Sequence, residues 1–160
     1  MKKILFSLLV VCLLVLTGCG KESSRNFVKN TTWTGSDESE VIFTDTRIDW
    51  YQSAEDHNDN YYSGEYKLYT GKKAVNYITK DLSEYGITKE ELQRVFDSRD
   101  EFKEKNFVVF DIRYDKFVLD GEEQEITRPL VPWFGFILED DTFLYVVNMN
   151  TASYYSFTKK

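Results

Sequence analysis

Short runs of β-branched and aromatic residues, separated by turn residues, follow one another along most of the chain. In the run VVFDIRY, from Val108 to Tyr114, apolar side chains alternate with Asp111 and Arg113, which is typical of a strand with one buried face. Further strands are expected at 40–44, 47–51, 117–119, 122–126, 133–138, 143–147 and 154–158, with a hairpin over 64–79 turned at Thr70-Gly71-Lys72. The pattern predicts a mostly β fold.

One amphipathic helix is expected in the middle of the chain. Thr88 and Glu91 have the spacing of a capping box, in which each side chain binds a free backbone N–H of the first turn. Apolar side chains then share one helical face, at Leu92, Val95, Phe96 and Phe102. We expect a helix over 89–104 that lies across an opening or an edge of the sheet.

Eight to ten short strands in sequential order predict a small up-and-down antiparallel barrel or a strongly curled meander, because closure removes exposed strand edges. Residues 31–160 are long enough for one β-rich domain with its own core. Trp33 in TTWTGS, before the first hairpin, and the later GEYKLY resemble the small lipocalin-like domains of bacterial lipoproteins. The lipocalin glycine precedes its tryptophan, whereas Gly35 follows Trp33, and no lipocalin ligand is carried over.

The first residues have the organisation of a signal peptide. Lys2 and Lys3 precede an apolar run, 4–16, that is shorter than a membrane span of about 20 residues. Leu16-Thr17-Gly18-Cys19 then resembles the lipobox of bacterial lipoproteins. The resemblance implies that 1–18 is removed, that a diacylglycerol on Cys19 anchors the chain to the extracytoplasmic face of the cell membrane, and that 19–30 is a tether.

Charge and cysteine content exclude several functions. The chain has a formal net charge of −7, and removal of the two signal-peptide lysines leaves 18 basic against 27 acidic residues, a charge of −9. Such a surface repels phosphate backbones, so no nucleic-acid partner is expected. The only cysteines are Cys12 and Cys19, so the domain behind them has no disulfide, no zinc–thiolate site and no cysteine nucleophile. No cofactor is predicted.

The polar stretch from Ser53 to Tyr62 offers oxygen ligands but not a recognisable metal site. Asp56, Asn58 and Asn60 have the spacing of the first calcium-loop ligands, but a tyrosine and a lysine replace the later glycine and acid. We interpret the stretch as a solvated loop between strands and predict no metal. His57 is the only histidine and lies in this polar segment, so we predict no catalytic triad and no enzyme activity.

Two binding functions remain open. The first is an interaction module for an envelope protein or a cell-wall component, favoured if Trp133 and Phe134 in RPLVPWFGF are exposed. The second is a carrier of a small apolar ligand, favoured by a pocket of about 300 Å³ or more with a few convergent polar groups. Its candidate lining residues are Trp50, Tyr66, Tyr77, Phe110 and Ile112. An enzyme would instead need paired carboxylates in a cleft.

Overall fold

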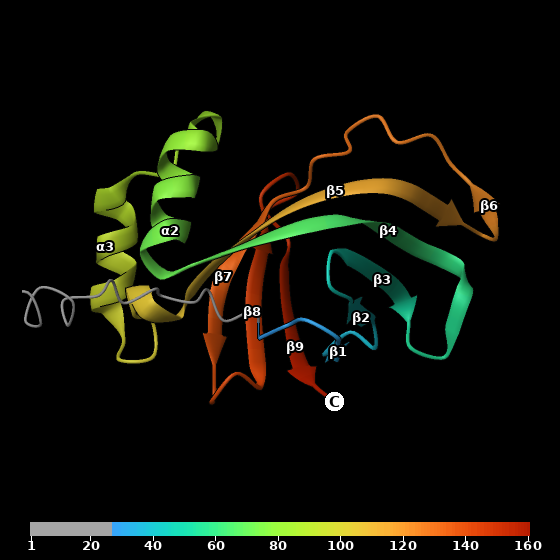
Figure 1. Ribbon diagram of the computed structural model, residues 1–160, viewed down its shortest axis with the longest axis horizontal. Coiled ribbons are helices and arrows are strands. Elements are labelled where there is room, and N and C mark those ends of the chain that lie inside the picture. Colours follow the sequence, from blue (N-terminus) through green and yellow to red (C-terminus); the bar gives the residue numbers. More distant parts are fainter. Residues whose placement is uncertain (1–26) are drawn as a thin grey trace, which may run out of the picture.

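The computed structural model describes residues 27–160, which form a closed antiparallel β-barrel with a helical layer on one side (Figure 1). The predicted signal peptide, Cys19 and the tether as far as residue 26 lie outside the described residues. The strands are β1 (Thr31–Gly35), β2 (Glu40–Phe43), β3 (Arg47–Ser53), β4 (Asp56–Thr70), β5 (Phe107–Leu119), β6 (Glu122–Glu123), β7 (Trp133–Leu138), β8 (Phe143–Asn148) and β9 (Tyr154–Lys159).

The barrel is an up-and-down meander. Eight strands form the closed wall, and the short β6 pairs only with the end of β5. Each wall strand is antiparallel to the next, and the first and last strands close the ring where Trp33 lies opposite Lys159. This confirms the predicted fold class and decides between its two forms, because the sheet is closed.

Inward-facing side chains fill most of the barrel. The alternation predicted for β5 is confirmed, since Val108, Phe110, Ile112 and Tyr114 all face the interior and are buried. The inner cluster consists of Val28, Trp33, Val41, Phe43, Ile48, Tyr66, Val108, Phe110, Ile112, Tyr114, Trp133, Ile137, Leu144, Val146 and Phe157. Burial on this scale stabilises the domain by roughly 1.5–3 kcal/mol for each large apolar side chain.

A helical layer covers the outer face of β5 and β7 (Figure 1). It consists of α2 (Gly71–Asn76), the π-helical turn η1 (Tyr77–Asp81), the 3₁₀ turn η2 (Ser83–Tyr85), α3 (Lys89–Ser98) and the 3₁₀ turn η3 (Glu104–Asn106). The outer cluster between this layer and the barrel consists of Ala74, Val75, Ile78, Leu82, Leu92, Phe96, Phe107, Val109 and Phe136. Strand β5 is therefore buried on both faces over 107–112.

The predicted hairpin over 64–79 is wrong in its second half. Strand β4 ends at Thr70, and the chain turns into α2 at Gly71, whose φ of +54° is a left-handed value that glycine adopts without strain. Ala74, Val75 and Ile78 then lie on one helical face and are buried in the outer cluster. Tertiary burial of that face decides against a strand here.

The predicted start of the long helix is confirmed and its end is wrong. The Thr88 hydroxyl accepts from the Glu91 N–H at 3.2 Å, and the Glu91 carboxylate accepts from the Thr88 N–H at 2.9 Å. The helix ends at Ser98 instead of 104, because the next residue is extended and the Lys103 ammonium binds the Phe96 carbonyl at 3.2 Å. Phe102 still packs against the barrel, with its ring 4.6 Å from that of Phe136.

The two ends of the barrel differ. At one end Val28 is fully buried, the Phe27 ring meets Trp33 edge-on, and the Lys159 ammonium lies over the same indole. The C-terminus is at this end, whereas the loop before β7 and the loop between β8 and β9 lie at the opposite end (Figure 1). All strands and both clusters lie within 27–160, so a chain that begins at Lys21 retains the whole described core and is expected to fold by itself.

Candidate functional site: a pocket at the barrel mouth

A pocket of about 410 Å³ opens at the barrel end opposite Phe27 and the C-terminus (Figure 1). Strands β3, β4, β5 and β9 supply its aromatic side chains, and the segment between β6 and β7 passes over it. We call it the mouth pocket; it is lined by Trp50, Tyr62, Tyr114, Phe117, Glu125, Ile126, Thr127, Arg128, Val131, Asn148, Asn150, Thr151 and Tyr155. Its volume is within the range of small-molecule sites.

Aromatic rings form one wall of the mouth pocket. The rings of Tyr62 and Phe117 are parallel, with centroids 4.3 Å apart, and the Trp50 indole stacks on Tyr62 at 5.6 Å. Strand pairing explains this, because Trp50 lies opposite Tyr62 and Tyr62 lies opposite Phe117 in the register of the sheet. Tyr155 adds a fourth ring, whose centroid is 5.0 Å from that of Trp50.

Polar atoms at the inner side of this wall lack hydrogen-bond partners. Within residues 27–160, none is found for the Nε1 atoms of Trp50 and Trp133 or for the Tyr114 hydroxyl, although all three atoms are buried. The Trp133 indole is 0 % exposed and meets Trp50 at a ring distance of 5.7 Å. A buried polar group without a partner costs about 1–3 kcal/mol, and folded proteins keep few of them.

Burial keeps the pocket phenols protonated. It raises the pKa of Tyr114 well above the ordinary value of 10.0, and the nearby phenols of Tyr155 and Tyr62 raise it further. Burial also raises the pKa values of Tyr62 and Tyr155. At neutral pH the inner side of the pocket is therefore uncharged, and its buried polar groups are O–H and N–H donors.

The segment between β6 and β7 is fixed over the pocket by backbone hydrogen bonds. The Tyr114 N–H donates to Pro129 at 2.9 Å, and the Val131 N–H donates to Ile112 at 2.8 Å. The Asn150 amide donates to the Leu130 carbonyl at 2.8 Å. Charged side chains occur in the pocket lining only on this segment, at Glu125 and Arg128, and both are exposed at the rim.

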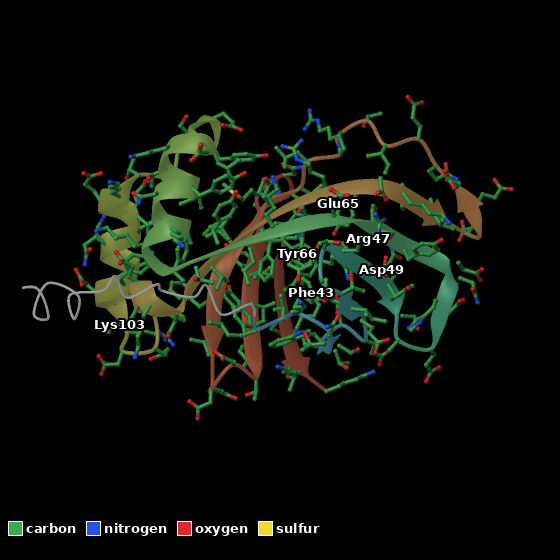
Figure 2. All side chains as sticks on the ribbon, in the orientation of Figure 1. Phe43, Arg47, Asp49, Glu65, Tyr66 and Lys103 are labelled. Carbon is green, nitrogen blue, oxygen red and sulfur yellow. The ribbon has the colours of Figure 1, made fainter. Side chains whose placement is uncertain are left out.

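The structure separates the residues that the sequence analysis grouped. Trp50 lines the mouth pocket and Trp133 lies behind it. Tyr66 and Phe110 pack deeper in the barrel, each against the Phe43 ring, at 5.2 and 5.5 Å (Figure 2). Outside the barrel, Tyr77 and Phe134 pack against the outer cluster, and the Tyr77 hydroxyl donates to Asp111 at 2.7 Å.

Sequence reasoning missed the other pocket aromatics. Tyr62 and Tyr155 each follow another tyrosine, and the second of each pair faces inward because strand side chains alternate. Tyr114 ends the apolar alternation of β5, where a phenol replaces the aliphatic residues that precede it. A polar aromatic at an inward strand position was the available signal.

The stretch from Ser53 to Tyr62 belongs to the β3–β4 hairpin as expected, but most of it is strand and the loop is short. Strand β4 already begins at Asp56, and the chain turns at 54–55. His57 stacks on Tyr51 at 3.9 Å, and its Nε2 lies 2.8 Å from the buried Glu40 carboxylate. Among the described residues no three His, Cys, Asp or Glu side chains are grouped to hold a metal ion.

Comparisons with known proteins found no match. No protein-family model, curated protein or solved structure matches the chain. In the part of the chain that the structure describes, no helix is long and apolar enough to cross a membrane.

Proposed function

We propose that this protein is a lipid-anchored, extracytoplasmic binding protein whose mouth pocket holds a small, largely apolar ligand. The observation that carries the proposal is the pocket of about 410 Å³, whose aromatic wall adjoins buried donors that have no partner in the described chain. Such an arrangement contributes little to stability, which is expected of a site shaped for a ligand. The volume of this pocket supports a carrier, because it exceeds the roughly 300 Å³ expected of a small-molecule site.

The anchor part of the proposal rests on the lipobox at 16–19. Replacing Cys19 with Ala in the full-length chain should move the protein from the membrane fraction to the soluble fraction. Retention of the variant in the membrane fraction would contradict the anchor and leave the pocket proposal untouched.

Ligand binding is tested with N-phenyl-1-naphthylamine, a neutral dye that fluoresces in apolar sites, and a soluble form that begins at Lys21. Thr127 lies at the pocket rim and is exposed, so Thr127→Trp places an indole over the opening without disturbing the core. Thr158→Trp is the matched control, because Thr158 is an exposed threonine of β9 outside the pocket.

We expect saturable fluorescence in the unmodified protein and the Thr158→Trp control, and a loss of at least tenfold in affinity in Thr127→Trp. Equal binding by both variants would overturn the mouth pocket as the site. Native mass spectrometry of protein isolated gently from the source envelope should then show a stoichiometric adduct of small mass.

An interaction module is the second candidate. Trp133 is fully buried and Phe134 packs under the helices, so the aromatic surface predicted there is not available. A different aromatic surface favours this function. Tyr154 is 68 % exposed, and its ring stacks at 6.1 Å on that of Tyr145, on the outer face of β8 and β9. If this surface binds a partner, Tyr154→Ser should lose a co-purifying envelope protein while dye binding persists.

A further inference from the structure

We infer that the mouth pocket selects a neutral, planar ring compound that carries a carbonyl or ether oxygen as a hydrogen-bond acceptor. The inference rests on the proposed function, because it assigns a ligand class to the same pocket. Its support is the chemistry of the unpartnered atoms, the distribution of charge and the arrangement of the wall rings.

The unpartnered atoms require an acceptor. An indole Nε1 only donates, so Trp50 and Trp133 offer two hydrogens and no lone pair. The Tyr114 hydroxyl is a protonated phenol and supplies a third donor, on a residue that lines the pocket. A purely apolar ligand leaves all three unsatisfied, whereas a ligand oxygen that accepts from one of them removes one unsatisfied donor.

The distribution of charge requires that this acceptor be neutral. The charged side chains of the lining, Glu125 and Arg128, are both exposed at the rim, and the inner wall consists of aromatic rings. A carboxylate buried among those rings loses its water without gaining a cation, and neutral N–H and O–H donors do not compensate for that loss.

The wall rings favour a flat ligand. Tyr62 and Phe117 are 1° from parallel, and Trp50 is 20° from parallel with Tyr62. Parallel rings present flat faces on which a planar ring packs with offset stacking. A saturated or branched ligand of equal volume makes fewer of these contacts.

Access to the donors requires movement of one ring. The Nε1 atoms of both tryptophans and the Tyr114 hydroxyl have essentially no exposed surface. Tyr155 contacts both indoles, at ring distances of 5.0 and 5.7 Å, and is itself only half-buried. Rotation of the Tyr155 ring is therefore the step that admits the acceptor, and binding should change the tryptophan fluorescence.

The experiment compares three probes by equilibrium dialysis against the soluble form. Naphthalene has the planar ring without an acceptor, 2-acetylnaphthalene adds a neutral carbonyl, and 2-naphthoate has nearly the same shape as the acetyl compound but carries a negative charge. Naphthalene binding tests the pocket alone. The difference between the probes tests the inference.

We expect 2-acetylnaphthalene to bind about tenfold more tightly than the other two, the gain from one satisfied hydrogen bond. Tyr114→Phe, which removes only the hydroxyl, should reduce that preference while naphthalene binding persists. Tyr145→Phe is the matched control, because it also removes a single phenol oxygen but lies on β8 outside the pocket lining, so it should leave the preference unchanged.

Equal binding of all three probes, tighter binding of 2-naphthoate, or an unchanged preference in Tyr114→Phe would overturn the inference and leave the pocket as a general apolar site. Failure of every probe and of the naphthylamine dye to bind would overturn the proposed function as well.

Discussion

The mouth pocket and the outer cluster are both rich in aromatic residues and share strand β5. They differ in whether the polar atoms of those aromatic side chains have hydrogen-bond partners. In the outer layer the Tyr77 hydroxyl donates to Asp111, and the Tyr85 hydroxyl donates to Asn150, both at 2.7 Å. At the mouth, the Tyr114 hydroxyl and the Trp50 Nε1 have no partner among residues 27–160.

This difference in hydrogen bonding distinguishes residues that stabilise the fold from residues that can bind a ligand. A hydroxyl paired inside the protein already contributes its hydrogen bond to stability, whereas an unpaired one lowers stability until something else binds it. Aromatic content alone does not distinguish the two regions. The hydrogen bonding of their tyrosine hydroxyls and indole N–H groups does.

The largest predicted effect is on the outer cluster. Phe107 is fully buried and contacts the rings of Phe96 and Phe136 at 5.5 Å each. Phe107→Ala should lower the free energy of unfolding by about 3–5 kcal/mol, measured by urea denaturation. Phe117→Ala, at the half-exposed wall of the mouth pocket, should lower the free energy of unfolding clearly less. Equal losses in the two variants would contradict the distinction between the two regions.

The next effect concerns the strand contact beside the pocket. A Cβ on Gly64 would lie 2.3 Å from the Arg113 carbonyl oxygen and 2.6 Å from the Tyr114 Cα, both backbone atoms. Gly64→Ala should therefore push β4 and β5 apart, lower the free energy of unfolding by about 1–3 kcal/mol and weaken dye binding. Gly86→Ala is a useful contrast: no atom lies within 4 Å of its added Cβ, but its φ of +74° is strained, so it should lower stability without weakening dye binding.

The sharpest contrast comes from removing single hydroxyls. Tyr114→Phe should raise the free energy of unfolding of the free protein by about 1–3 kcal/mol, because a buried donor without a partner is removed. Tyr77→Phe should lower it by about 1 kcal/mol, because the hydrogen bond to Asp111 is lost. Changes of the same sign in both variants, in parallel urea titrations, would contradict this distinction.

The start of α3 offers a smaller, local effect. Thr88→Ala removes one half of the capping box and should lower the free energy of unfolding by about 1 kcal/mol. Dye binding should be unchanged, since α3 lies over the outer cluster. A weakened pocket would show that the two regions are coupled.

The smallest effect depends on pH. The hydrogen bond from Arg47 lowers the pKa of Asp115 in the folded state below the ordinary 3.8. The pair therefore stabilises the protein above the unfolded-state pKa, and this contribution is lost as the pH falls through the lower folded-state pKa. Asp115 is half-exposed, so we expect less than about 1 kcal/mol. The difference in unfolding free energy between Asp115→Asn and the unmodified protein should shrink from pH 6 towards pH 3.

Most strands were predictable because alternation is a local property. However, β1 was not expected, the strand expected at 117–119 is the end of β5, and β6 is shorter than the expected 122–126. The β2–β3 hairpin and the last three strands lie within two residues of their predicted bounds, as does the capping-box start of α3. The helix α2 was not predictable, because its apolar residues also fit a strand. Only packing against the outer cluster, which buries Ala74 and Ile78 on one face, favours the helix. Nor was the full pocket predictable: Trp50 was found, but its neighbours come from β4, β5 and β9, and only closure of the barrel brings them together.

Both ends of the described chain meet at one side of the barrel, and the pocket opens at the other. If Cys19 holds the anchor, the seven residues between it and Phe27 reach at most about 25–30 Å at full extension. An anchor at Cys19 would then keep this end of the barrel within that distance of the membrane, with the mouth pocket at the far end (Figure 1). Such a geometry favours capture of molecules that arrive from outside the cell membrane over extraction of lipids from the bilayer beneath.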